Sequence, residues 1–226
     1  MSSIVLTGGG SAGHVTPHLA LIPALRAQHW TLSYIGSCTG IERDIITREN
    51  IPYYPISTGK FRRHLTWRHV LEPFQVIKGI WDAWWHLRQL KPQLVFSKGG
   101  FVAFPVVFSA WLRRIPVIAH ESDVTPGLAN RLSFPFVTRL CVTFEQTKAA
   151  FSSQDKVLLT GTPIRRALFQ GDPQKALARC HFSGEKPVLL VMGGSLGAKR
   201  INQAIRDSLP ILCRTYHVIH LCGQDN

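Results

Sequence analysis

Short apolar runs alternate along the chain with longer stretches in which apolar residues recur at helical spacing. The apolar runs predict strands over residues 4–7, 31–35, 53–56, 94–97, 116–119, 139–142, 157–159, 187–192 and 216–221. The stretches between them predict helices over 17–28, 41–49, 74–90, 103–112, 125–133, 145–151 and 199–212, with one more beginning at 173. Strand and helix in alternation are typical of βαβ units around a parallel sheet, so we expect an α/β fold. Pro23 is expected to kink or weaken the first helix.

A Gly-Thr-Pro turn at 161–163 follows the seventh predicted strand and suggests a domain boundary. Residues 1–163 then form a doubly wound, Rossmann-like domain with a parallel sheet. Residues 164–226 begin a second unit, in which Asp172 is placed to cap a helix that starts at Pro173. Two strands cannot close an α/β layer, so we expect this second Rossmann-like domain to be incomplete.

A glycine-rich turn follows the first strand of each predicted domain. The first turn, 8–14, leads from strand to helix, which points free backbone N–H groups at an anion. It predicts a phosphate site, although such a turn can also bind nothing. In the second turn, 193–198, Ser195 is a candidate hydrogen-bond donor to phosphate on the same logic as Ser11.

Three polar or glycine-rich turns, at 8–10, 98–101 and 120–123, end predicted strands at one edge of the sheet. Ligands of doubly wound sheets gather at that edge, so these turns predict a cleft. His14 lies just beyond the first turn, where a helix N-terminus would lower its pKa. A neutral imidazole there could act as a general base, or His14 could merely hydrogen-bond the turn.

The turn at 120–123 (His-Glu-Ser-Asp) allows two interpretations. Its side chains could exchange protons with a substrate or bind its hydroxyls, or Ser122 or Asp123 could cap a helix near Thr125. Arg165, which follows the boundary turn, could bind phosphate through paired hydrogen bonds or could simply be a surface residue.

The segment 61–91 mixes tryptophan, phenylalanine and aliphatic residues with arginine and lysine. This mixture is typical of a helix in a membrane interface, where tryptophan is favoured. It also fits a helix whose aromatic side chains pack on the sheet, and we expect that packing for most of them. Membrane contact stays open for the end from Phe61 to Trp67. No repeated stacking platform supports a nucleic-acid partner.

Composition and charge indicate a folded globular protein with anionic partners. The 45% hydrophobic and 17% charged residues fit a folded globular chain, and a net charge of +13 favours anionic partners. Five scattered cysteines without zinc-ligand spacing fit a reduced, cytosolic compartment. We also expect no signal peptide and no membrane span, because neither pattern occurs.

The first glycine turn is shared with NAD(P)-dependent oxidoreductases. Such enzymes end the second strand with an acidic residue about 20 residues on, which holds the ribose. Here the second predicted strand ends in Ile35-Gly36-Ser37, which argues against a dinucleotide cofactor.

Five motifs occur in a fixed order, at 9–14 (GGSAGH), 97–101 (SKGGF), 120–122 (HES), 161–165 (GTPIR) and 193–198 (GGSLGA). Over essentially the whole chain this order resembles the MurG family, the peptidoglycan N-acetylglucosaminyltransferases of glycosyltransferase family 28. The resemblance implies a GT-B fold, in which two Rossmann-like domains face each other across a cleft. It implies inverting transfer of N-acetylglucosamine (GlcNAc) from UDP-GlcNAc to an undecaprenyl-pyrophosphoryl-MurNAc-pentapeptide acceptor, giving lipid II.

The same resemblance implies a peripheral enzyme at the cytoplasmic face of the bacterial membrane, with no metal or other cofactor. Its partners would be UDP-GlcNAc, the undecaprenyl-linked acceptor and an anionic membrane surface. By position, His14 matches the family's base, and Glu121 is a second catalytic candidate. Substrate contacts are expected from Ser11, Ala12, Gly13, Asp123, Arg165 and Ser195, of which Arg165 and Ser195 match donor-contacting positions.

Three departures from the family pattern stand out. Asp123 replaces a common asparagine, which exchanges hydrogen-bond donors for acceptors, and Ser11-Ala12 replaces the commoner Thr-Gly. The family also continues well beyond this length, so we expect a truncated member with weakened binding of UDP-GlcNAc. The alternative is a non-catalytic membrane- or acceptor-binding half-protein. Another lipid glycosyltransferase or a sugar-nucleotide epimerase would share the fold but not the ordered motifs.

Overall fold

The computed structural model describes residues 2–59, 72–194 and 197–223. The chain forms two compact units, Met1–Arg166 and Ala167–Asn226. The division falls just after the predicted boundary at 163/164.

The first unit is built on a parallel seven-stranded sheet. Its strands are β1 (Ser3–Thr7), β2 (Thr31–Ser37), β3 (Tyr53–Ile56), β4 (Leu94–Ser97), β5 (Val117–Glu121), β6 (Arg139–Val142) and β7 (Val157–Leu159). Their order is β3-β2-β1-β4-β5-β6-β7, so the chain winds one way from β1 and the other way from β4. This confirms the predicted α/β architecture, and places the switch point, where such sheets bind ligands, between β1 and β4.

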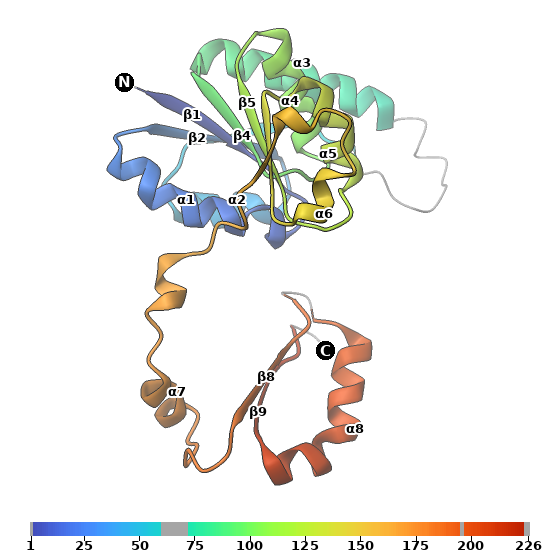
Figure 1. Cartoon of the computed structure of the whole chain (residues 1–226). Helices are drawn as coiled ribbons and strands as arrows, with labels where there is room; N and C mark the ends of the chain where they lie inside the picture. The colour runs from blue at the N-terminus through green and yellow to red at the C-terminus, as the bar shows by residue number, and fades with distance from the viewer. Residues whose placement is uncertain (1, 60–71, 195–196, 224–226) are drawn as a thin grey trace. The chain divides into compact units, whose positions relative to one another are not determined.

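Helices cover both faces of this sheet (Figure 1). They are α1 (Thr16–Ala27), α2 (Ile41–Arg48), α3 (Glu72–Leu90), α4 (Ala103–Leu112), α5 (Leu128–Ser133) and α6 (Glu145–Lys148). Alternate strand residues point to opposite faces, so Leu6 packs with Ile22 of α1 while Val95 packs with Val106 of α4. Helix α1 continues through Pro23, whose ring is exposed.

Helix α3 turns its large aromatic residues outward, so the expectation that most of them pack on the sheet is wrong. An exposed row, which we call the aromatic stripe, consists of Phe74, Ile77, Trp81 and Trp85, exposed by 67, 63, 64 and 47%. The buried side carries Gly79, Ala83 and Leu87 instead. A Cβ on Gly79 would lie 2.2 Å from the carbonyl oxygen of Ser57, so this face must be small. The segment from Phe61 to Trp67 lies outside the described residues.

The imidazole of His18, on α1, is fully buried between the rings of Tyr34 and Phe96. Burial lowers the pKa of His18 from 6.5 to about 3, and the nearby positive charge of Lys98 adds to the shift. Between about pH 3 and pH 6.5, the His18 ring is therefore neutral in the folded protein and protonated in the unfolded chain.

Acidification from pH 6.5 to about 5 is expected to cost about 2 kcal/mol of stability through His18 alone. The unfolded state binds a proton there and the folded state does not, so stability falls as the pH falls below 6.5. Urea unfolding of His18→Leu should show a smaller acid-dependent loss than the parent. The exposed-site control His29→Gln should keep the parental dependence; equal curves for His18→Leu and parent would contradict the assignment.

The second unit pairs β8 (Val188–Met192) with β9 (His217–Leu221) in a parallel two-stranded sheet. Its helices are α7 (Pro173–Arg179) and α8 (Lys199–Thr215). No residue of β8 or β9 is fully buried, and Val188, Leu190 and Met192 are each exposed by about half. In the part of the chain described, no helix combines the length and apolar character that crossing a bilayer requires.

Candidate functional site

The loops that follow β1 and β4 are locked together at the switch point. The amide of Lys98 donates to the carbonyl of Thr7 at 2.9 Å, and that of Gly9 donates to Gly99 at 3.4 Å. Gly100 has φ +84°, and a Cβ there would lie 2.1 Å from the carbonyl oxygen of Gly9. Glycine is therefore required at 100 both by backbone conformation and by space.

A buried carboxylate, Glu42 of α2, holds the first glycine loop from inside. It accepts hydrogen bonds from the amide of Gly10 at 3.3 Å and from the amide and hydroxyl of Ser37. Sequence reasoning looked for an acidic residue at the strand end itself and missed Glu42, which reaches back from the next helix. Because this carboxylate faces the loop backbone, it is not presented to a ribose.

The remaining loop amides, of Ser11, Ala12 and Gly13, donate to no other backbone group of the described chain. They form the start of a short 3₁₀ turn (Ala12–His14) that runs into α1. Free N–H groups at such a start favour an anion. The amides of these three residues, which the family resemblance implies as substrate contacts, thus remain available.

The half-buried imidazole of His14 sits beside this loop. Its Nδ1 lies 3.3 Å from the carbonyl oxygen of Lys98, which can only accept, so Nδ1 carries the proton and Nε2 keeps a free lone pair. Burial lowers the pKa of His14 from 6.5, and the positive charge of Lys98 lowers it further. The sequence predicted this direction but attributed it to the helix terminus. A neutral imidazole with one free nitrogen can accept a proton at neutral pH.

Lys98 is a second residue of this site that the sequence had not singled out. Its side chain is 1% exposed, and Nζ donates to the hydroxyl of Ser122 at 2.9 Å. Burial lowers the pKa of Lys98, while the carboxylates of Glu121 and Asp123 oppose that shift. The sequence around residue 98 does not predict that its side chain is buried, because a lysine that follows a strand is ordinarily solvated.

Glu121 organises the loop that follows β5. Its carboxylate accepts from the amides of Asp123 at 3.0 Å and Gly127 at 2.9 Å, and from the side-chain amide of Asn130 at 3.0 Å. Of the two interpretations of this turn, a cap by Ser122 or Asp123 near Thr125 is therefore not what the structure has. Glu121 satisfies these amides instead, and α5 begins only at Leu128.

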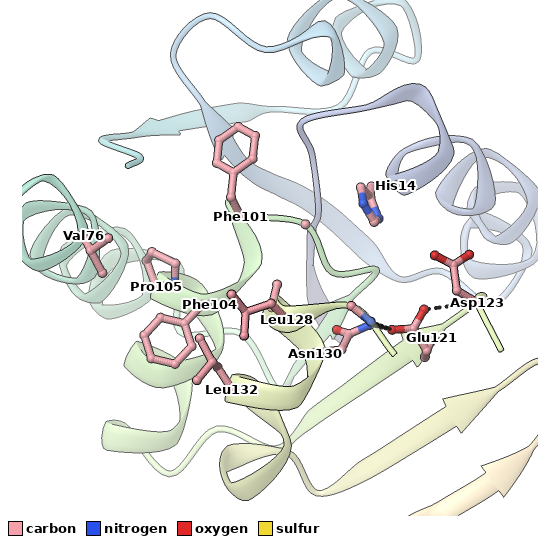
Figure 2. A pocket seen from close by; sticks show the side chains of 13 residues that line it. His14, Val76, Phe101, Phe104, Pro105, Glu121, Asp123, Leu128, Asn130 and Leu132 are labelled. Carbon is pink, nitrogen blue, oxygen red and sulfur yellow. Dashed lines mark hydrogen bonds between the residues drawn. The ribbon is translucent and has the colours of Figure 1, made fainter. Parts of the chain in front are cut away.

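A pocket of about 490 Å³ opens between these loops and helices α3, α4 and α5 (Figure 2). Its polar end is lined by His14, Glu121 and Asp123. Its other end is apolar, lined by Val76, Phe101, Phe104, Pro105, Leu128 and Leu132. The volume is within the range of ordinary ligand pockets. The exposed side chain of Asp123 faces the same space as His14.

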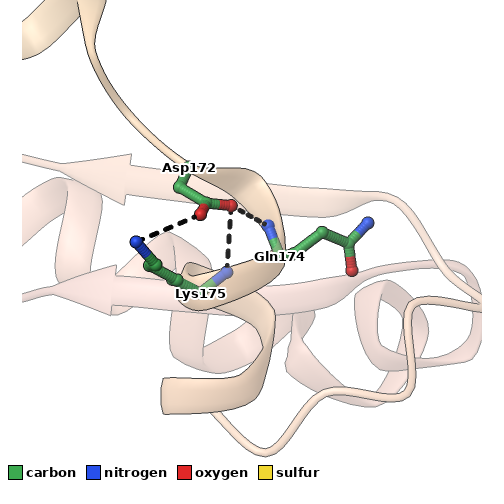
Figure 3. A network of polar contacts seen from close by, with 3 residues as sticks. All are labelled: Asp172, Gln174 and Lys175. Atoms are coloured by element: carbon green, nitrogen blue, oxygen red, sulfur yellow. Dashed lines mark hydrogen bonds and ion pairs between the residues drawn. The ribbon is translucent and has the colours of Figure 1, made fainter.

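Two residues, Arg165 and Ser195, are candidates for contact with the sugar donor. Arg165 is exposed on the segment after β7, and Ser195 lies outside the described residues. The predicted cap of α7 is confirmed, since Asp172 accepts from the amides of Gln174 at 3.0 Å and Lys175 at 3.3 Å (Figure 3). Among the described residues, no three His, Cys, Asp or Glu side chains are grouped to hold a metal ion.

Comparison with protein families gives two matches along the chain. The glycosyltransferase family 28 N-terminal domain matches residues 4–142, and the glycosyltransferase family 28 C-terminal domain matches residues 188–226.

Curated relatives extend over the whole chain. A UDP-N-acetylglucosamine--N-acetylmuramyl-(pentapeptide) pyrophosphoryl-undecaprenol N-acetylglucosamine transferase of Bacillus anthracis is 53% identical over 226 residues. One of the same name from Legionella pneumophila (strain Paris) is 54% identical over 222 residues. The matches cover 100% and 98% of this chain but 64% and 61% of the relatives' length.

Solved structures show the same architecture. Acinetobacter baumannii MurG superposes with a TM-score of 0.71 at 26% identity, covering 100% of this chain and 60% of that one. UDP-GlcNAc 2-epimerase from Neisseria meningitidis, bound to UDP-GlcNAc, gives 0.64 at 15% identity, covering 97% and 65%. The second likeness is one of fold alone.

Proposed function

This chain belongs to glycosyltransferase family 28, as its motifs predicted, and from that premise we propose that it transfers GlcNAc from UDP-GlcNAc to undecaprenyl-pyrophosphoryl-MurNAc-pentapeptide. The product would be lipid II, made at the cytoplasmic face of the membrane. The observation that carries the proposal is His14, whose free Nε2 lies at the pocket beside the available amides of residues 11–13. The names of the relatives at 53–54% identity support it.

In the proposed reaction, an acceptor hydroxyl attacks C1 of the GlcNAc unit. Nε2 of His14 takes the hydroxyl proton, the new glycosidic bond forms with inversion, and UDP leaves with the electron pair of the broken bond. The amides of Ser11, Ala12 and Gly13 bind the acceptor's diphosphate. We assign no metal and no other cofactor to this step.

The other site residues take supporting roles in this scheme. Asp123 accepts hydrogen bonds from acceptor hydroxyls, and Glu121 acts by holding the loop that presents Asp123 rather than by exchanging a proton. Arg165 and Ser195 are assigned to UDP-GlcNAc, as the family resemblance implies.

The aromatic stripe of α3 is assigned to an anionic membrane surface. The guanidinium of Arg88 lies 5.6 and 5.9 Å from the ring centroids of Trp84 and Trp85, and that of Arg113 lies 5.3 Å from Trp84. Exposed aromatic rings interleaved with cations suit the interface, where rings enter the acyl boundary and cations meet lipid phosphates.

Binding to vesicles rich in phosphatidylglycerol should fall at least about tenfold when Trp81 and Trp85 are both changed to glutamate, because apolar burial is lost and like charge is added. Co-sedimentation at low and high salt measures this, and the parent should bind less at high salt. The control Phe169→Glu changes a ring outside the stripe that is still more exposed, at 74%, and should bind as the parent does. Parental binding by the double variant would contradict the assignment.

Transfer of radiolabelled GlcNAc to the lipid-linked acceptor, measured beside the full-length Bacillus anthracis relative, tests the proposed function. Labelled lipid II formed by this chain would support it. Acceptor binding without product would instead favour a membrane- and acceptor-binding module, for which the pocket and the stripe both lie in residues 1–166. If the chain shows no acceptor binding and no transfer, both functions are overturned.

A further inference from the structure

The pocket of the first unit changes character along its length. Near His14 it offers a base, carboxylates and free amides, while the opposite end is walled by aliphatic and aromatic side chains (Figure 2). Sugars and peptides would leave hydroxyl and amide groups unpaired against such walls, which is unfavourable. The apolar end therefore suits hydrocarbon, and the whole pocket suits an amphiphile whose polar head lies at His14.

The part of the apolar wall formed by α5 lies outside the protein core, whereas Pro105 is buried and Phe101 packs against the core. Leu128 and Leu132 of α5 are 60 and 46% exposed, so each leaves apolar surface in water that a ligand could cover. Neither is needed to bury the helix, since α5 is anchored by Asn130 and Ser133, which are buried. Exposed apolar side chains that gather around a concavity mark a binding site more often than scattered ones do.

The apolar end also reaches the helix that carries the aromatic stripe. Val76 lines the pocket, while Phe74 and Ile77, its neighbours along α3, belong to the aromatic stripe. A hydrocarbon chain lying in the pocket would thus leave it beside residues assigned to the bilayer. One amphiphilic ligand could therefore place its polar head at residues 11–14 and its apolar tail at α3.

We propose that this apolar end, which we call the prenyl groove, binds the isoprene units nearest the diphosphate of the polyprenyl acceptor. This deepens the proposed function and rests on it. The groove would hold the acceptor in register with His14 by its tail, while the amides of residues 11–13 hold the diphosphate. Affinity would then depend on the tail as well as on the head.

Farnesyl diphosphate, inorganic pyrophosphate and farnesol separate these contributions, each titrated calorimetrically into the chain below its aggregation concentration. Farnesyl diphosphate is expected to bind at least about tenfold more tightly than pyrophosphate. Leu128→Asn should reduce that ratio at least about threefold and leave pyrophosphate affinity unchanged. The matched control Leu112→Asn, at an equally exposed leucine ending α4, should change neither value. Thermal melts establish that both variants are folded.

The outcomes separate the groove from the proposed function. Equal affinities for farnesyl diphosphate and pyrophosphate would overturn the groove while leaving the diphosphate site in place. Equal losses in Leu128→Asn and Leu112→Asn would also overturn it, because the tail would then bind without register. Farnesol binding as tightly as farnesyl diphosphate would show that the diphosphate adds nothing, and would overturn both the diphosphate site and the register that depends on it. Failure of both phosphorylated ligands to bind would remove the diphosphate site and so count against the proposed function itself.

Discussion

Alanine in place of His14 is expected to lower kcat for GlcNAc transfer by about 10²- to 10⁴-fold, with little change in KM for the acceptor. The variant loses the group that accepts the hydroxyl proton but keeps the amides of residues 11–13. His14→Asn places an amide N–H where Nδ1 donates to the carbonyl of Lys98 but cannot take up the proton, so it should be equally slow. Steady-state rates with saturating UDP-GlcNAc measure both effects.

The pH profile gives an independent reading of the same residue. The acid limb of kcat/KM should lie below pH 6.5, because burial and the charge of Lys98 lower the pKa of His14. Lys98→Met removes that charge, so the limb should move to higher pH. A His14→Ala enzyme within about threefold of the parent, or one with an unchanged acid limb, would place the base elsewhere.

Alanine at position 100 is expected to destabilise the first unit by about 2–4 kcal/mol and to lower transfer by about 10²-fold or more. A Cβ there would lie 2.1 Å from the carbonyl oxygen of Gly9, a backbone atom that no side-chain rotation can move aside. The two glycine loops would have to separate, which moves His14 and the amides of residues 11–13. Urea unfolding and transfer assays report the two effects separately.

Substitutions at two other glycines serve as controls. They separate the conformational cost of alanine at position 100 from the cost of the close contact with Gly9. Gly161 also has positive φ, +72°, but an added Cβ meets nothing within 4 Å, so Gly161→Ala isolates the conformational cost. Gly171→Ala has neither problem and should resemble the parent. If Gly100→Ala is no worse than Gly161→Ala, the contact between the loops does not hold the site.

The alternation of apolar runs was sufficient to predict the sheet, because buried parallel strands are nearly continuous in apolar residues. Strands β4 and β6 and helix α4 begin and end where the pattern placed them. Helix α5 begins at Leu128 rather than 125, since the carboxylate of Glu121 keeps the preceding loop out of helical conformation. A local pattern cannot report a competing hydrogen bond from the end of a strand.

Burial was harder to predict at individual residues. The tryptophans of α3 were assigned inward on hydrophobicity, yet Gly79 and Ala83 face inward because the neighbouring backbone approaches closely. The burial of Lys98, a cation beneath the site loops, was not predicted at all. Which residues are brought beside His14 depends on strand order, and the order of β1, β4 and β5 is a property of the whole sheet.

The two-ended pocket has a consequence for turnover. Its contacts, to the diphosphate and to the prenyl tail, are with parts of the acceptor that the reaction leaves unchanged, so substrate and product would be held alike. Binding of this uniform kind lowers KM without raising kcat. Release of the finished glycolipid must then depend on weaker contacts at the sugar end. Tight binding of the lipid would therefore lead to product inhibition.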